Sequence, residues 1–347
     1  MLHKVGNKQT GEGYILSPSP LPLDDRMRDV LLQYFIAQFK ADEYFHLFHE
    51  DGLEHNVVYG AACAVFDDPD TLADVSRDVA QHLYESSMHP NIKGGDLFVV
   101  RFSDCLLNGE PTSALGLFKA ESVSQFLKVR IDDEQWSRRE GDPGATGLLQ
   151  LHVDKGIDTH RLDKGALIFD HERSEGFVVS VVDASGRGSD AQYWRDAFLR
   201  LQQRQDEYYN TQEVMNAYKA FVTDALPQRF DDVSKADQAD LLNRSVQYFK
   251  DKDNFDMDDF ARDVLQQPEV IDSFASFREE YEQAHEVELP AQFDINETAV
   301  KKQARAFKSV IKLDKNFHIY VHGDRQLIEQ GEDERGKYYK VYYHEES

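Results

Sequence analysis

The sequence has little cysteine, no long apolar run and far fewer basic than acidic residues. Its two cysteines, Cys63 and Cys105, are too few for a disulfide framework and form no Cys-x-x-Cys pair, so both are expected to be free thiols in a reducing compartment. No run of about 18 apolar residues is present, so no membrane-spanning helix and no membrane partner is expected. Residues 1–7 lack the apolar core of a signal peptide, which favours a cytoplasmic location over secretion.

Signatures of catalysis and of cofactor binding are missing as well. Gly186-Arg187-Gly188 has neither a third glycine nor the Gly-Lys-Ser/Thr ending of a phosphate-binding loop, and a hinge is the expected role of this segment. The sequence contains no Gly-x-Ser-x-Gly elbow, and its carboxylates are too many and too scattered for one acid–base pair to stand out. The chain is therefore not expected to be an enzyme, and no cofactor is expected.

Two segments resemble metal sites but fall short of them. His46 and His49, with His55 nearby, could meet on one face of a helix, but no further ligand follows at a recognisable spacing. The acidic segment that starts at Asp251 has Asp where an EF-hand loop needs glycine, and Arg262 where the loop needs a bidentate glutamate. No metal site is therefore expected, and the acidic segment is interpreted as a solvated face.

Negative charge is in excess, and it is distributed unevenly. The chain has 39 Lys and Arg against 64 Asp and Glu, a formal net charge of −25 at pH 7. Residues 291–347 carry ten basic and ten acidic side chains, so the whole excess lies in residues 1–290. Within the neutral end, residues 301–325 hold seven basic and two acidic side chains. An even spread of negative charge would repel DNA, whereas a local basic segment favours phosphate binding.

Hydrophobic periodicity changes twice along the chain. Residues 26–40 and 71–88 have the apolar spacing of helices, and short apolar or alternating runs follow after Gly94-Gly95. Because no helices separate these runs, they predict an antiparallel sheet. The predicted strands are Leu97–Phe102, Ala114–Phe118, Phe126–Ile131, Leu148–Val153, Ala166–Phe169 and Phe177–Val182.

These patterns predict an α+β fold in three parts. Residues 1–188 form an antiparallel sheet with flanking helices, and residues 189–290 form an acidic helical region. Within the second part, residues 205–290 hold eight basic and 21 acidic side chains. Residues 191–285 are expected to be wholly helical. Residues 291–347 form a small basic unit, with a helix from about Glu297 to Phe307 followed by a small β-sheet.

The basic residues of the last part have helical spacing. Lys301, Arg305, Lys308 and Lys312 share one face if the helix reaches Lys312. If the helix ends near Phe307, only the first three align and Lys312 begins a strand. The row is either a phosphate-binding surface or a structural feature, solvated or docked onto the acidic helical region. We define the basic strip as the candidate DNA-binding residues of this segment: Lys301, Lys302, Arg305, Lys308, Lys312 and Lys315.

Several stretches, in order along the chain, resemble one known family. The longest runs from Lys301 to Gly323 and contains the basic strip. The shorter ones are Leu2–Asn7, His89–Gly95, Gly116–Lys119, Leu162–Gly165, Ala191–Trp194, Gln267–Ile271 and Tyr339–Tyr342. Through them the chain resembles the bacterial 37-kDa nucleoid-associated proteins, in the version found in Bacteroidetes-type bacteria. The resemblance implies association with the nucleoid and a link to DNA topoisomerases, and it assigns no catalytic or DNA-contacting residues.

Charge, spacing and resemblance together predict a nucleoid-associated protein of the bacterial chromosome. It is expected to bind DNA weakly and without sequence preference through the basic strip, because phosphate contacts alone give salt-sensitive, unspecific binding. The alternative is a regulator of a DNA enzyme such as a topoisomerase, whose acidic surface binds the protein partner while DNA contact is indirect. Salt-dependent retention on DNA distinguishes the two.

Overall fold

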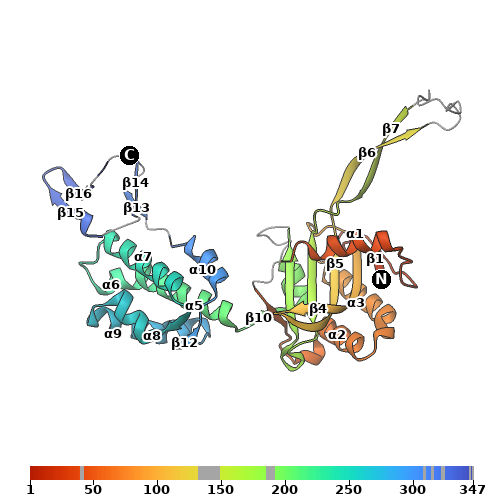
Figure 1. Ribbon diagram of the computed structural model, residues 1–347, viewed down its shortest axis with the longest axis horizontal. Coiled ribbons are helices and arrows are strands. Elements are labelled where there is room, and N and C mark those ends of the chain that lie inside the picture. The colour runs from red at the N-terminus through yellow and green to blue at the C-terminus, as the bar shows by residue number, and fades with distance from the viewer. Residues whose placement is uncertain are drawn as a thin grey trace. The chain divides into compact units, whose positions relative to one another are not determined.

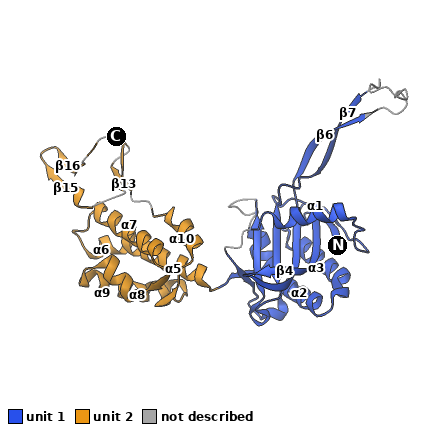
Figure 2. Cartoon of the chain, in the orientation of Figure 1, with its two compact units in different colours: residues 1–204 blue, residues 205–347 orange. Residues whose placement is uncertain are grey.

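The chain forms two compact units. The computed structural model describes residues 1–39, 43–131, 149–184, 192–307, 310–313, 316–321, 325–343 and 345. The units are Met1–Arg204 and Gln205–Ser347 (Figure 2). The predicted division into three parts, with boundaries after residues 188 and 290, remains a prediction. The expected hinge at Gly186-Arg187-Gly188 lies outside the described residues.

The first unit is built on an eight-stranded sheet (Figure 1). Its strands are β1 (Leu2–Val5), β2 (Tyr14–Ile15), β3 (Phe45–Leu47), β4 (Gly95–Leu107), β5 (Glu110–Ala120), β8 (Lys164–Phe169), β9 (Val178–Asp183) and β10 (Leu201–Gln203). Their order in the sheet is β10-β3-β9-β8-β5-β4-β1-β2, and every neighbouring pair is antiparallel. The predicted α+β class and antiparallel sheet are therefore confirmed.

Helices cover both faces of this sheet. They are α1 (Asp25–Ile36), α2 (Val57–Asp67) and α3 (Leu72–Ser86). Successive side chains of a strand point to opposite faces, so β5 contributes to two cores. Leu115 and Leu117 pack in the core that contains α2, α3 and Trp194, whereas Phe118 stacks on Phe35 of α1 with ring centroids 4.2 Å apart. Burial on both faces explains why the central strands read as continuous apolar runs.

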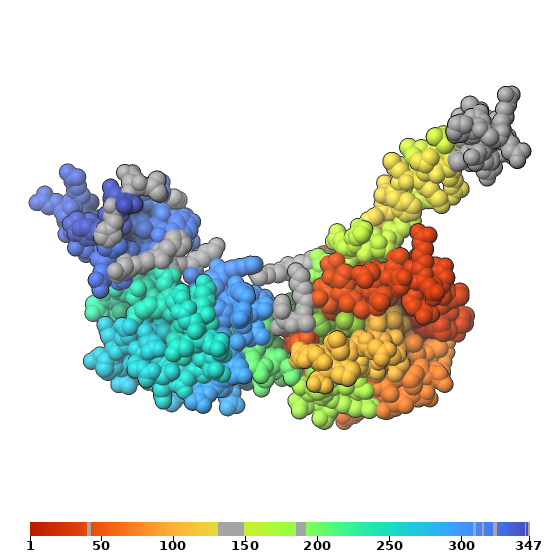
Figure 3. Space-filling model, in the orientation of Figure 1, coloured from red at the N-terminus to blue at the C-terminus, as the bar shows by residue number. Residues whose placement is uncertain are grey.

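A long ribbon leaves this sheet between β5 and β8. Its strands, β6 (Val123–Ile131) and β7 (Leu149–Ile157), pair antiparallel with each other and form a separate two-stranded sheet. Figures 1 and 3 show the ribbon projecting from the first unit. The strand predicted over Phe126–Ile131 lies within β6 and is confirmed.

The second unit is mainly helical. Its helices are α5 (Glu207–Ala220), α6 (Leu226–Arg229), α7 (Lys235–Asp251), α8 (Met257–Phe260), α9 (Pro268–His285) and α10 (Glu297–Ala304). Its strands form antiparallel pairs: β11 (Asn254–Asp256) with β12 (Gln292–Asp294), β13 (Val310–Leu313) with β14 (Phe317–Tyr320), and β15 (Ile328–Asp333) with β16 (Gly336–Val341). Aromatic side chains fill the core, where Tyr218 meets Phe260 edge-on at 4.9 Å.

The expectation that residues 191–285 are wholly helical is wrong in two places. Leu201–Gln203 pairs with β3 at the edge of the large sheet, and Asn254–Asp256 pairs with β12. In the second case Phe255 stacks between Phe249 and Phe293, at 5.5 and 4.8 Å between ring centroids. This packing joins segments about 40 residues apart, so a tertiary contact overrides the local helical pattern.

Two further features of the chain are its thiols and the character of its helices. Cys63, in α2, and Cys105, in β4, are free thiols. None of the described helices is both long and apolar enough to cross a membrane.

Candidate nucleic-acid interface

Helix α10 ends before it can align the whole basic strip. The side-chain oxygen of Asn296 caps the first turn, where it accepts hydrogen bonds from the backbone N–H groups of Thr298 and Ala299, both at 3.0 Å. The last residue of the helix is Ala304. Arg305 follows as the C-cap. The helical row from Lys301 to Lys312 is therefore wrong, and the alternative of an earlier helix end is confirmed.

The strip residues consequently lie on different elements. Lys301 and Lys302 are in the last turn of α10, and Lys312 lies within β13. Val310–Leu313 is rich in aliphatic residues and pairs with Phe317–Tyr320, which favours a strand over a continued helix. Lys308 and Lys315 fall outside the described residues.

Both strip residues of α10 have partners close by. The Lys301 ammonium lies 2.8 Å from a carboxylate oxygen of Glu297, one turn earlier on the same helix. The Lys302 ammonium donates to the hydroxyl of Tyr208 at 2.7 Å and lies 5.3 Å from the centre of that ring. Exposed pairs of the Lys301–Glu297 kind contribute little and exchange readily with solvent ions.

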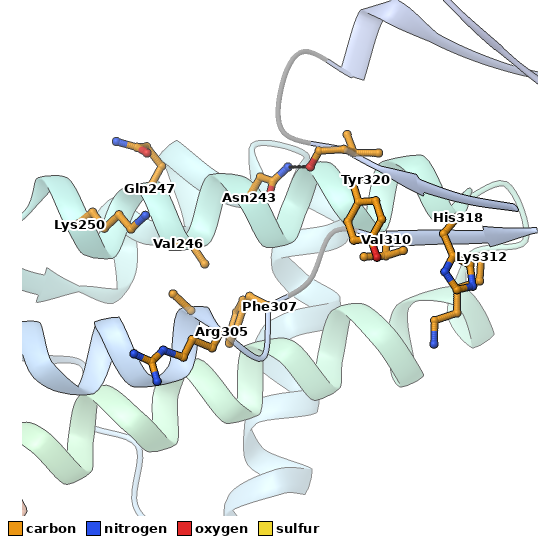
Figure 4. Close-up of a pocket in the computed structure, with 12 residues that line it drawn as sticks. Asn243, Val246, Gln247, Lys250, Arg305, Phe307, Val310, Lys312, His318 and Tyr320 are labelled. Atoms are coloured by element: carbon orange, nitrogen blue, oxygen red, sulfur yellow. Dashed lines mark hydrogen bonds between the residues drawn. The ribbon is translucent and has the colours of Figure 1, made fainter.

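The other described strip residues line a groove. Its volume is about 680 Å³, and its walls are α7, the end of α10 and the hairpin β13–β14 (Figure 4). We call it the basic groove; its lining residues are Asn243, Val246, Gln247, Lys250, Ala304, Arg305, Phe307, Val310, Lys312, His318, Tyr320 and Val321.

The register of the hairpin places its polar side chains in this groove. Lys312 is paired with His318, and Val310 with Tyr320, so these residues share one face. On the other face Ile311 packs against Ala236 and Ala239 of α7.

A side-chain bond fastens the hairpin to α7. The Asn243 amide donates to the carbonyl oxygen of Val321 at 3.1 Å (Figure 4). With one hairpin face packed on α7 and its end tied to Asn243, the face that carries Lys312 and His318 is held toward the groove.

The groove combines unpaired cations with aromatic rings. Lys250, Arg305 and Lys312 are exposed, and among the residues that the structure describes none of the three forms an ion pair. Phe307 is buried, whereas the Tyr320 ring is 62% exposed. A row of free cations beside an aromatic ring suits a phosphate backbone with its bases.

Two polar residues that line this groove, Lys250 and His318, are absent from the sequence-based strip. Lys250 directly precedes the acidic segment that starts at Asp251, so a count of charges over this stretch does not indicate a basic surface. His318 faces the groove only because β13 and β14 pair in this register. Alternation of side chains along a short hairpin could have indicated His318, whereas only tertiary packing brings Lys250 next to Arg305.

Comparison with known families bears on the whole chain. The family model described as nucleoid-associated protein YejK matches residues 1–336. The chain belongs to this family. It is a nucleoid-associated protein, and its family is not a family of enzymes. No curated protein matches the chain.

Four of the stretches that suggested this family meet in one buried polar cluster of the first unit. The Lys119 ammonium donates to the carbonyl oxygen of Lys93 at 2.7 Å, to the Glu121 carboxylate at 3.0 Å and to the Tyr193 hydroxyl at 2.9 Å. Lys164 pairs with Asp183 at 3.0 Å. Burial lowers the pKa of Lys119, and the neighbouring Glu121 carboxylate opposes that shift.

One of the histidines considered as metal ligands, His46, takes part in an ion-pair cluster of this nucleoid-associated protein. His46 lies on strand β3, so the interpretation of His46 and His49 as neighbours on a helix is wrong. Ligand atoms of His46, Glu172 and Glu175 lie within 4.8 Å of one another. However, the Glu172 carboxylate already accepts hydrogen bonds from Arg204 at 2.6 Å and from His46 at 2.8 Å.

Arg204 decides the character of this cluster. Its hydrogen bonds, with those of His46, lower the pKa of Glu172 to about 2. A carboxylate with a depressed pKa stabilises the fold above its unfolded pKa, and this stabilisation is lost as the pH falls toward about 2. A metal ion would have to displace the Arg204 guanidinium from Glu172. We therefore interpret the cluster as one that stabilises the fold.

Proposed function

We propose that this nucleoid-associated protein binds DNA directly, through phosphate contacts in the basic groove and without reading base sequence. The observation that carries the proposal is the convergence of Lys250, Arg305 and Lys312, from three separate elements, on one groove with no ion-pair partner among the described residues. Each cation that neutralises a phosphate releases counterions, which drives binding even for a chain of high negative charge. The remaining residues of the basic strip, Lys301, Lys302, Lys308 and Lys315, are expected to add further phosphate contacts.

The groove offers little for base recognition. Its amide side chains, the groups that read base edges, have intramolecular partners: Asn243 donates to Val321, and Gln247 donates to Asp251 at 2.7 Å. Stacking on Tyr320 tolerates any base. Binding is therefore expected to be indifferent to sequence.

A titration of duplex binding at several salt concentrations tests the proposal. The strip and the groove together hold seven Lys and Arg side chains, of which about four are expected to reach one DNA backbone at once. The slope of log affinity against log salt is then about −3 to −5. Repulsion by the net charge of −25 is expected to lower the affinity and flatten the slope, most strongly at low salt. Duplexes of different sequence should give the same curve. Failure to bind any duplex near about 0.05 M salt would contradict direct contact.

That contrary result would favour the second candidate, a regulator of a DNA enzyme such as a topoisomerase. The observation in its favour is the acidity of residues 205–290, with eight basic and 21 acidic side chains. In that case the protein should bind a purified topoisomerase in a salt-dependent way when DNA has been removed by nuclease.

A further inference from the structure

The ribbon β6–β7 has one apolar and one polar face. Along β6 the odd-numbered residues share a face with the odd-numbered residues of β7, because Leu127 pairs with Val153 and Val129 with Leu151. Five neighbouring aliphatic residues on the outer part of this face are each 62–67% exposed: Leu127, Val129, Leu149, Leu151 and Val153. Nearer the root of the ribbon, Gln125 pairs with Lys155 on the same face. We call this set the apolar ribbon face. The opposite face carries Ser124, Phe126, Lys128, Arg130, Gln150, His152 and Asp154.

Such a face is unusual on a chain that stays alone in water. Five aliphatic side chains exposed to this degree present on the order of 500 Å² of contiguous apolar surface, the size at which a patch marks an interaction site. A two-stranded ribbon is also only marginally stable by itself, and it needs a further layer over its apolar face. Among the described residues, the sheets and helices of the first unit leave these five side chains uncovered.

The root of the ribbon is rigidly held. The Asp163 carboxylate accepts the backbone N–H groups of Glu121 and Ser122, both at 2.7 Å, and the Ser122 hydroxyl at 2.8 Å. These two residues directly precede β6, and Glu121 is also bound by the buried Lys119 and by Tyr193. The buried cluster therefore fixes the direction in which the ribbon leaves the sheet. A projecting element held in this way loses little conformational entropy when it binds.

We propose that the apolar ribbon face is the self-association surface of this protein, where the ribbons of two copies pack face to face. An identical ribbon offers a partner of the same length and apolar pattern, as a two-fold interface requires. Two such faces bury on the order of 1,000 Å² in total, which reaches the threshold for a specific interface.

Charge also favours a second copy at this place. The described part of the ribbon carries Lys128, Arg130 and Lys155 against the single acid Asp154. Each chain has a net charge of −25, so most surfaces of two copies repel each other. Pairing through the described strands of the ribbons joins the copies where basic side chains outnumber acidic ones. Five neighbouring aliphatic side chains, by contrast, offer no group that binds a DNA phosphate.

The test is the molar mass of the full chain, without nucleic acid, over a range of concentrations by sedimentation equilibrium. The chain of 39.9 kDa is expected to approach twice that mass as the concentration rises. The variant Leu127→Thr, Val129→Thr, Leu151→Thr and Val153→Thr is expected to weaken association at least 100-fold, while its β-branched residues preserve strand propensity. The matched control changes the other face: Lys128→Thr, Gln150→Thr and His152→Thr. It is expected to associate as the parent does.

A cross-link keeps the test decisive if the quadruple variant folds poorly. In a background with Cys63→Ser and Cys105→Ser, Val129→Cys should give a covalent dimer with a short bis-maleimide, and Arg130→Cys, on the opposite face, should give much less. A parent that stays at 39.9 kDa at every concentration would overturn the proposal. So would equal cross-linking from the two faces, or association of the quadruple variant that matches the parent. None of these readouts depends on DNA binding.

Discussion

The variant Lys250→Ala, Arg305→Ala and Lys312→Ala is expected to lose about 100-fold or more in affinity for every duplex near 0.1 M salt. With a slope of about −0.9 per phosphate neutralised, each contact contributes a factor of roughly 8 at that salt concentration. Three contacts together therefore exceed two orders of magnitude. The salt slope should fall by about 2 to 3 as well, because three fewer counterion-releasing contacts remain. The measurement is fluorescence anisotropy of a labelled duplex, titrated at several salt concentrations.

The control for this variant makes the same change of net charge elsewhere in the second unit. Arg335→Ala, Lys337→Ala and Lys340→Ala alter three exposed residues of the turn and strand at β15–β16. If general attraction alone holds DNA, both triple variants lose affinity equally, and the groove has no special role. If the groove variant binds like the parent, the three cations are not the contact.

The largest loss of stability is expected from Lys119→Met. The substitution leaves the Glu121 carboxylate and the Tyr193 hydroxyl buried without their cationic partner. Breaking a buried ion pair from one side costs about 3–5 kcal/mol, because an uncompensated charge remains in the interior. Urea unfolding followed by tryptophan fluorescence measures this loss in the first unit, since both tryptophans of the chain precede residue 205.

Two further variants show whether the ion pair itself is responsible. Lys4→Met makes the same change at an exposed lysine of β1 and is expected to alter the free energy of unfolding by less than about 0.5 kcal/mol. Adding Glu121→Gln to Lys119→Met removes the orphaned charge and should restore part of the stability. If Lys119→Met is as stable as Lys4→Met, the buried ion pair between Lys119 and Glu121 does not stabilise the fold.

Local patterns in the sequence predicted much of the first unit. The runs from Leu97 to Val182 were found because alternation and turn clusters are properties of neighbouring residues. β3 and β10, each three residues long, carry too few residues for a pattern, and they exist because Leu47 and Leu201 pair across the sheet edge. β6 was predicted as a strand, but its separation from the large sheet is a matter of pairing that no local pattern encodes.

The candidate site was predicted only in part for the same reason. Charge counting found Arg305 and Lys312, which do line the basic groove, but it joined them through a helix that ends at Ala304. Lys250 lies more than 50 residues away in an acidic neighbourhood, so only the packing of α7 on the β13–β14 hairpin reveals it. The net negative charge is an average over the whole chain, and it gives no indication of a groove lined by basic side chains.

The measurement that tests direct DNA contact most closely is a lysine footprint. The full chain is acetylated briefly with and without a saturating duplex at low salt, and the modification of each lysine is read by mass spectrometry. The basic-groove proposal predicts that Lys250 and Lys312 react several-fold more slowly in the complex, while Lys337 and Lys340 react at the same rate. Bound DNA that leaves Lys250 and Lys312 as reactive as in the free protein would contradict it.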